Sequence, residues 1–91
     1  MLLLISYDLD AQGARPANYE QIRERITSSA IEARRALYSQ WLVVTDDSPA
    51  AWVERLRDLL TPADRLFVVR VTGSPNGWLP ADFWEWINSH V

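Results

Sequence analysis

Apolar residues recur along this chain with two different periods, and the changes between them mark the expected elements. An apolar run at residues 2–5 leads into Ser-Tyr-Asp-Leu-Asp at 6–10, which predicts a first strand at the start of the chain. Residues 35–45 are rich in β-formers and are interpreted as two short strands joined near Ser39. Residues 65–72 alternate apolar side chains between two faces, which predicts a last strand.

Three further segments show the three- and four-residue spacing of amphipathic helices. The first is expected to begin at Asn18 as its cap, the second at Ser48 with Pro49 in the first turn, and the third at Pro80. Their inward stripes are predicted to be Tyr19, Ile22, Ile26, Ala30 and Ala33; Trp52, Val53, Leu56, Leu59 and Leu60; and Phe83, Trp84, Ile87 and Val91. Trp86 is expected to lie off the last stripe.

The order β-α-β-β-α-β with a terminal helix predicts an α+β, ferredoxin-like sandwich, in which two helices cover one face of an antiparallel sheet. Ninety-one residues suit a single domain, spanning residues 1–91. The other face would expose apolar side chains, expected to include Leu2, Leu4, Leu66 and Val68. Because such patches usually mark a partner or a covering segment, we expect a homodimer, with the terminal helix covering the patch or adding to the interface.

Composition narrows the possible chemistry. The sequence has no cysteine, which excludes disulfides, thiolate metal ligands and cysteine nucleophiles, so a metal would be bound by oxygen or by His90. The net charge of -3 argues against the broad basic surface of a tight duplex binder. No apolar stretch approaches the length of about 20 residues that spans a bilayer. We therefore expect a cytoplasmic protein without membrane association.

The end of the first strand carries the candidate chemistry. Side chains alternate along a strand, so Ser6, Asp8 and Asp10 are expected on one face. Two carboxylates spaced in this way can hold a hard cation such as Mg²⁺, with Mn²⁺ as a substitute, for chemistry on phosphates. The spacing leaves an alternative open, in which these aspartates only bond the turning backbone where the strand ends.

Arginines accompany this strand end in the expected fold. Basic residues exceed acidic ones between residues 11 and 45, which suggests that Arg15, Arg34 or Arg35 positions a nucleic-acid substrate. Arg70 of the last strand is expected on the same face as Asp8, where it would contact a phosphate. In the alternative, Arg70 neutralises the carboxylates as an ion pair and leaves no metal site.

Short motifs spread over almost the whole chain resemble one family. They are Ser-Tyr-Asp-Leu at 6–9, Gln-Trp-Leu-Val-Val-Thr at 40–45, Asp-Arg-Leu-Phe-Val-Val at 64–69, Val-Thr-Gly at 71–73 and Gly-Trp-Leu-Pro at 77–80. Together they are similar to the small bacterial proteins labelled the SinR family, which are related to CRISPR-associated protein two and to VapD. The chain departs from the CRISPR-associated pattern after the last strand, where residues 77–80 and a Trp-rich helix replace a short exchanging strand.

The resemblance implies a function. In the CRISPR-associated relatives, the aspartate that ends the first strand faces its twin across a homodimer and is proposed to bind magnesium for phosphodiester hydrolysis, and VapD relatives are regarded as ribonucleases. Asp8 matches that residue, and Ser6 and Tyr7 beside it are candidate substrate contacts. The implied activity is that of a metal-dependent, endoribonuclease-like phosphodiesterase on RNA or DNA. The alternative is an inactive homodimeric scaffold or a module that binds nucleic acid or a protein partner.

Overall fold

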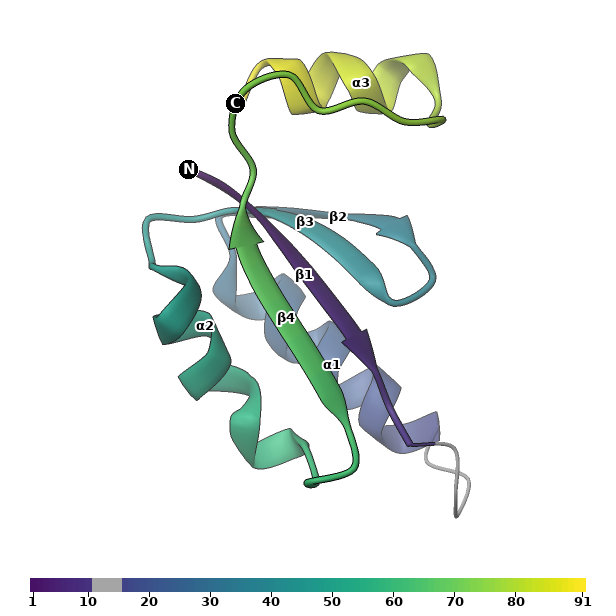
Figure 1. The fold of residues 1–91 in the computed structure, drawn as a ribbon, viewed down its shortest axis with the longest axis vertical. Coiled ribbons are helices and arrows are strands. Elements are labelled where there is room, and N and C mark those ends of the chain that lie inside the picture. The colour runs from purple at the N-terminus through teal and green to yellow at the C-terminus, as the bar shows by residue number, and fades with distance from the viewer. Residues whose placement is uncertain (11–15) are drawn as a thin grey trace.

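Four antiparallel strands form a sheet in the order β2-β3-β1-β4, with helices on both of its faces (Figure 1). The computed structural model describes residues 1–10 and 16–91. The strands are β1 (Leu2–Asp8), β2 (Glu32–Leu37), β3 (Gln40–Val44) and β4 (Arg65–Arg70). The helices are α1 (Pro16–Ser29), α2 (Pro49–Leu56) and α3 (Ala81–Asn88), and a 3-10 turn, η1 (Arg57–Leu59), follows α2. The first strand lies beside the last, so the predicted ferredoxin-like arrangement is confirmed.

Cross-strand pairing decides which side chains share a face. In the middle of β1, Ile5 is opposite Trp41 of β3 on one side and Val68 of β4 on the other. Because residues directly opposite each other in an antiparallel pair project to the same face, these three side chains lie together. The odd-numbered residues of β1 face α1 and α2, and the even-numbered residues face the side that carries α3.

The α1 and α2 side contains the larger core. Ile22 and Ile26 of α1 and Trp52 and Leu56 of α2 have no exposed surface, as their predicted stripes require. The other buried members of this cluster are Leu3, Ile5, Tyr7, Leu9, Trp41 and Val43. Val53 was expected to face inward and is 39% exposed, because it follows Trp52 directly and the helix turns it toward solvent.

The first residues of α1 and α2 can be compared with the helix starts predicted from capping residues and proline. The Ser48 hydroxyl accepts the backbone N–H of Ala51 at 3.2 Å, and Pro49 opens α2, both as predicted. The first helix begins two residues before the expected cap, at Pro16, so the predicted start at Asn18 is wrong. Proline suits the first turn because its fixed φ matches the helix and its missing N–H would be unpaired there.

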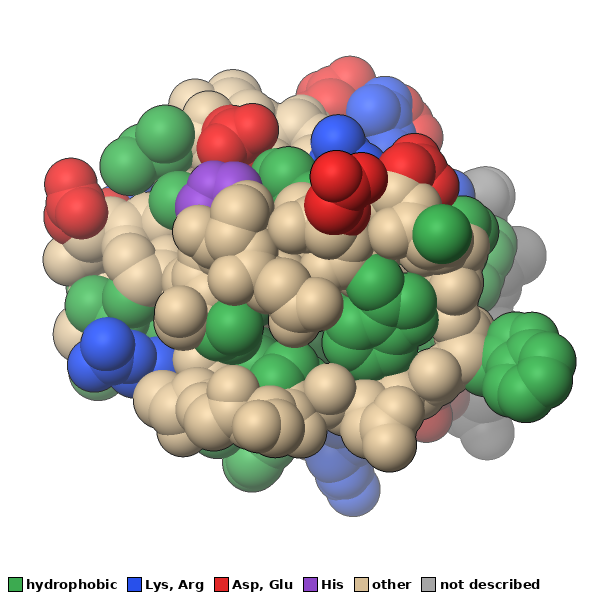
Figure 2. All heavy atoms as spheres, turned by 90° about the horizontal axis from the view of Figure 1, so that it is seen from above, with side chains coloured by type: hydrophobic (Ala, Val, Ile, Leu, Met, Phe, Trp, Pro, Cys, Tyr) green, Lys and Arg blue, Asp and Glu red, His purple; other side chains and the backbone are tan. Residues whose placement is uncertain are grey.

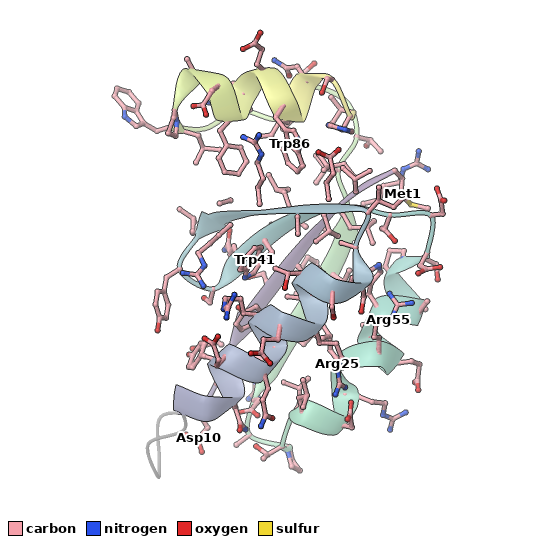
Figure 3. The ribbon with its side chains drawn as sticks, turned by 180° about the vertical axis from the view of Figure 1, so that it is seen from behind. Met1, Asp10, Arg25, Trp41, Arg55 and Trp86 are labelled. Carbon is pink, nitrogen blue, oxygen red and sulfur yellow. The ribbon has the colours of Figure 1, made fainter. Side chains whose placement is uncertain are left out.

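The terminal helix covers part of the other face, one of the two arrangements expected from the sequence. Trp86 and Ile87 of α3 pack with Leu2 and Leu42 of the sheet, and Figure 3 shows Trp86 pointing from α3 toward the strands. Trp86 was expected off the inward stripe, yet only 8% of it is exposed. Trp86 thus joins the predicted inward residues of α3, because Ile87 is buried beside it and Phe83 and Trp84 pack partly buried against the same cluster.

Two further expectations about this face are wrong. Leu66 and Val68 were expected on it, but they are opposite Tyr7 and Ile5 and therefore pack toward α1 and α2. Val91, assigned to the inward stripe of the last helix, is 48% exposed. The first error follows from register, since a shift of one residue moves every side chain of a strand to the opposite face.

Polar contacts fasten α3 to β2. The indole N–H of Trp86 donates to Oε1 of Glu32 at 3.4 Å, and Nε2 of His90 lies 3.2 Å from Oε2 of the same carboxylate. The guanidinium of Arg34 lies 5.1 Å from the centre of the Trp86 ring. From the α3 side, several hydrophobic side chains reach the surface between polar groups (Figure 2). No helix in the described parts of the chain is long and apolar enough to cross a membrane.

Candidate functional site

Asp8 is the last residue of β1, and its side chain is exposed. Across the β1–β4 pair it is opposite Arg65, and two residues earlier Ser6 is opposite Phe67. These four side chains therefore share the face that carries α3, beyond the part that α3 covers. The residues that line one open depression here are Ser6, Tyr7, Asp8, Ser39, Gln40, Arg65, Leu66 and Phe67. The structure thus brings Ser6 and Asp8 together, as predicted from the alternation of the strand.

Asp10 follows the strand and lies at the opposite end of β1 from Met1 (Figure 3). It lines a second, adjoining depression with Asp8, Leu9, Ala63 and Arg65. The backbone N–H of Asp10 donates to Oδ1 of Asp64 at 2.8 Å, and Oδ2 of Asp64 accepts the N–H of Thr61 at 2.8 Å. The Asp64 carboxylate therefore ties the end of β1 to the turn before β4, which supports the pairing of Asp8 with Arg65.

The carboxylate and imidazole side chains near Asp8 decide whether a metal ion could bind at this end of β1. In residues 1–10 and 16–91, no three His, Asp or Glu side chains gather where they could hold a metal ion. Mg²⁺ is often bound by one or two carboxylates together with water and substrate phosphates. No ion pair or side-chain hydrogen bond in these same ranges engages the Asp8 carboxylate. Within the described residues, Asp8 is thus an exposed carboxylate that could serve as one ligand of a metal ion, and a magnesium site stays a prediction.

Tyr7 was expected to contact substrate, but its side chain belongs to the core. It is 4% exposed, and its hydroxyl accepts the indole N–H of Trp41 at 3.1 Å. Burial raises the pKa of Tyr7, and the hydrogen bond from Trp41 offsets part of that rise. Tyr7 is among the residues that line the depression beside Asp8, but as an odd-numbered residue of β1 it packs its buried side chain toward α1 and α2. A contact of Tyr7 with substrate stays a prediction.

Arg70 was expected on the face of Asp8, and this prediction is wrong. Arg70 is opposite Leu3, near the start of β1, and shares the face of α1 and α2. It can neither neutralise Asp8 nor contact a phosphate bound there. The arginine opposite Asp8 is instead Arg65, at the other end of β4.

The remaining predicted arginines do not gather around Asp8. Arg34 and Arg35 project to opposite faces of β2, Arg34 against α3 and Arg35 against the ring of Trp41, at 5.1 Å from its centre. Arg15 lies outside the residues that the structure describes. Among the described residues, Arg34, Arg35 and Arg70 therefore do not share one basic surface.

Sequence reasoning missed Arg65, Phe67 and Gln40 as neighbours of Asp8. One signal was present, because neighbouring antiparallel strands place the end of one opposite the beginning of the other. The first residue of the predicted last strand, Arg65, could therefore have been identified from the sequence as the partner of the last residue of β1. Gln40 and Phe67 are opposite Ser6 on its two sides, a relation that depends on the register of both strand pairs.

Comparison with known proteins adds one finding. No family model matches the chain, and no curated protein does. Among solved structures, a crystal structure of Streptococcus pyogenes Cas2 at pH 6.5 matches with a TM-score of 0.59, over 79% of this chain and 87% of that chain, at 17% sequence identity. The chain has a Cas2-like fold. The predicted likeness to CRISPR-associated protein two is thus confirmed for the fold, and the relation to the SinR and VapD groups stays a prediction.

Proposed function

We propose that this Cas2-like chain forms a homodimer that cleaves phosphodiester bonds of RNA or DNA with a divalent cation, with Asp8 of each subunit contributing to one site. The main observation behind this proposal is the exposed position of the Asp8 carboxylate. Its carboxylate is exposed at the end of a buried strand and lines an open depression together with Arg65, whose Nη1 donates to the carbonyls of Ala63 and Asp64.

Apolar exposure on the same face supports pairing with a second copy. Phe67 is 64% exposed and Val69 is 38% exposed, and both lie on the face that α3 covers only in part. Removing apolar surface from water is favourable by about 25 cal/mol per Å². A two-fold contact repeats the same patch on both subunits, so a contact through Phe67 would place both Asp8 side chains near the joint.

The chain's own groups have defined parts in this proposal. The Asp8 carboxylates would hold Mg²⁺ or Mn²⁺, and the remaining positions would go to water and phosphate oxygens. When bound, such a cation stabilises negative charge on the phosphate and makes bound water more acidic. The Arg65 guanidinium would donate charge-assisted hydrogen bonds to a non-bridging phosphate oxygen. The hydroxyl of Ser6 on the same face would orient the substrate by a further hydrogen bond.

Cleavage of labelled RNA and DNA in the presence of Mg²⁺ or Mn²⁺ tests the proposal. Asp8→Asn keeps the shape of the side chain and removes its charge, so turnover is expected to fall by about 10²-fold or more, the scale of a lost catalytic group. Asp46→Asn is the matched control, because Asp46 is also exposed but follows β3 at the opposite end of the sheet. Cleavage that persists in Asp8→Asn, or that is lost equally in Asp46→Asn, would refute the proposal.

A second candidate function rests on Arg65. Because it is opposite Asp8 and lines both depressions with it, it can neutralise the carboxylate without any cation. The protein would then be an inactive homodimeric scaffold or a binding module for nucleic acid or a protein. Calorimetric titration of Mn²⁺ into the parent and Asp8→Asn proteins separates the two candidates. Equal heats favour the scaffold, and binding that disappears in the variant favours the metal site.

A further inference from the structure

An exposed aromatic residue lies next to the Asp8 strand end, at the turn between β2 and β3. Tyr38 is 73% exposed. Its ring packs against Tyr19 of α1, with centroids 5.7 Å apart and planes at 51°. The guanidinium of Arg35 lies 5.9 Å from the centre of the Tyr38 ring. Tyr38, Tyr19 and Arg35 are called the hairpin platform below.

Tyr19 of the hairpin platform and Ser39, the residue after Tyr38, accept hydrogen bonds from the two chain neighbours of Asp8. The backbone N–H of Tyr7 donates to the carbonyl of Ser39, the residue after Tyr38, at 3.1 Å. The N–H of Leu9 donates to the Tyr19 hydroxyl at 3.4 Å. The Tyr7 and Tyr19 rings are also in contact, with centroids 6.0 Å apart. The position of the platform is therefore fixed relative to Asp8 by backbone and side-chain contacts.

Packing holds the exposed ring without covering it. Tyr19 supports Tyr38 from α1, and Tyr7 supports Tyr19 from the core, where its own hydroxyl accepts the N–H of Trp41. Arg35 also lies over the Trp41 ring, at 5.1 Å from its centre. A supported ring loses less conformational entropy when a ligand stacks on it than a freely rotating one. Tyr38 therefore differs from Trp78, which is wholly exposed.

The two groups of this platform suit one class of ligand. An exposed aromatic ring stacks on an unpaired base, and a neighbouring guanidinium contacts the phosphate of the same strand. A duplex keeps its bases stacked on each other, so it offers no free base to Tyr38. The platform also lies at the β2–β3 turn rather than on Phe67 and Val69, so the proposed contact between two copies would leave it accessible.

We infer that the hairpin platform binds an unpaired nucleotide of a single-stranded nucleic acid, with its base on Tyr38 and its phosphate on Arg35, at the same end of the sheet as Asp8 but on the face that carries α1. The inference rests on the proposed function, because it assigns a substrate class to the proposed cleavage at Asp8. It makes Tyr38 a positioning residue that favours single strands over duplexes. It does not require that cleavage occurs, since binding by stacking is independent of a cation.

Binding is measured in the Asp8→Asn protein with EDTA, so that neither cleavage nor a metal contributes. The probes are a fluorescent single-stranded RNA, the DNA of the same sequence and the corresponding duplexes, followed by anisotropy. Tyr38→Ala is expected to weaken single-strand binding by about 5- to 150-fold, the loss of one base stack. Tyr38→Trp keeps an aromatic face and is expected to retain binding. Trp78→Ala removes another exposed aromatic side chain and is expected to change nothing.

Arg35 is tested separately, by Arg35→Lys. Lysine keeps the positive charge but loses the planar, forked guanidinium, so a several-fold loss of single-strand binding is expected. Circular dichroism and thermal unfolding of each variant establish that the fold persists. Tyr38→Phe provides a milder variant if Tyr38→Ala does not fold, and it is expected to bind like the parent.

Each result decides between the inference and another role. Unchanged single-strand binding in Tyr38→Ala overturns the inference, whatever Asp8 does in cleavage. An equal loss for single strands and duplexes overturns it as well, and so does a change confined to oligomeric state in sedimentation, which indicates a protein contact. If Tyr38→Ala weakens only single-strand binding while Asp8→Asn still cleaves, the inference stands and the proposed function fails.

Discussion

The two faces of the sheet are covered in different ways. On one face, α1 and α2 bring side chains with no exposed surface, such as Ile26 and Trp52, onto the strands. On the other face, α3 covers the part around Leu2 and Leu42 and leaves Phe67 64% exposed. The first face therefore forms the folding core, and the second keeps open the region that contains the candidate site.

The attachment of α3 is also of a different kind. Residues 71–80 connect it to β4, and Figure 1 shows it on the side of the sheet opposite to α1 and α2. Its connection to β2 depends on the Trp86 ring and on the Glu32 carboxylate, whose side chain is 52% exposed. Elements with few buried contacts open locally at a lower free energy than the global unfolding of the domain. We therefore expect α3 to be the least stable helix of the described chain.

The largest effect is expected when one tryptophan is replaced on each face of the sheet, which tests whether the two faces contribute differently to stability. Trp52 is fully buried, and its indole N–H donates to Oγ1 of Thr45 at 3.1 Å, so Trp52→Ala is expected to cost about 3–5 kcal/mol of unfolding free energy. Trp86→Ala is expected to cost about 1–3 kcal/mol, because α3 can detach while the sheet and its main core persist. Denaturant unfolding of both variants measures the difference. Equal losses would mean that the two faces contribute alike to stability.

A second test uses the buried hydroxyl of the main core. Burial raises the pKa of Tyr7, so above about pH 10 the unfolded chain ionises first and binds fewer protons than the folded chain. Stability is therefore lost as pH rises past this value. Tyr7→Phe is expected to show a weaker loss, and also a cost of about 1–3 kcal/mol at pH 7, because the Trp41 N–H loses its acceptor.

Unfolding of Tyr7→Phe is followed from pH 7 to pH 11 beside Tyr38→Phe, which removes an exposed phenol. A pH profile of Tyr7→Phe that matches the parent would show that the buried hydroxyl does not set the alkaline limit. If stability depended on pH in the same way in Tyr7→Phe and Tyr38→Phe, the buried phenol would affect alkaline stability no more than the exposed one.

The smallest test concerns the polar contacts of α3. Glu32→Gln removes the charge beside His90 and keeps the size of the side chain, with an expected cost below about 1 kcal/mol for this partly exposed pair. Hydrogen exchange is expected to accelerate up to about 5-fold in α3 and to stay unchanged in β1. Glu54→Gln, which disrupts the exposed pair with Arg57 on the other side of the sheet, is the control. Faster exchange in β1 would show that α3 and the sheet open together.

The carboxylates at the Asp8 end illustrate how far sequence reasoning extends to the site. The alternation of β1 correctly placed Ser6 and Asp8 on a common, accessible face, because that pattern depends only on the strand itself. The importance of Asp64 was not visible, since its two oxygens accept backbone N–H groups of Asp10 and Thr61, which only folding brings to it. The expected partner Arg70 was wrong for the same reason, because the choice of Arg65 depends on register.

The sequence by itself determined the succession of elements, the start of α2 at Ser48 and Pro49, and the outward direction of Asp8. These features follow from periodicity and capping, which act over a few residues. Only the tertiary structure decided that Arg65 is opposite Asp8, that Tyr7 is part of the core and that Trp86 covers the sheet. Such relations join residues far apart in the chain, and a shift of one residue in pairing would reverse the face of each strand side chain.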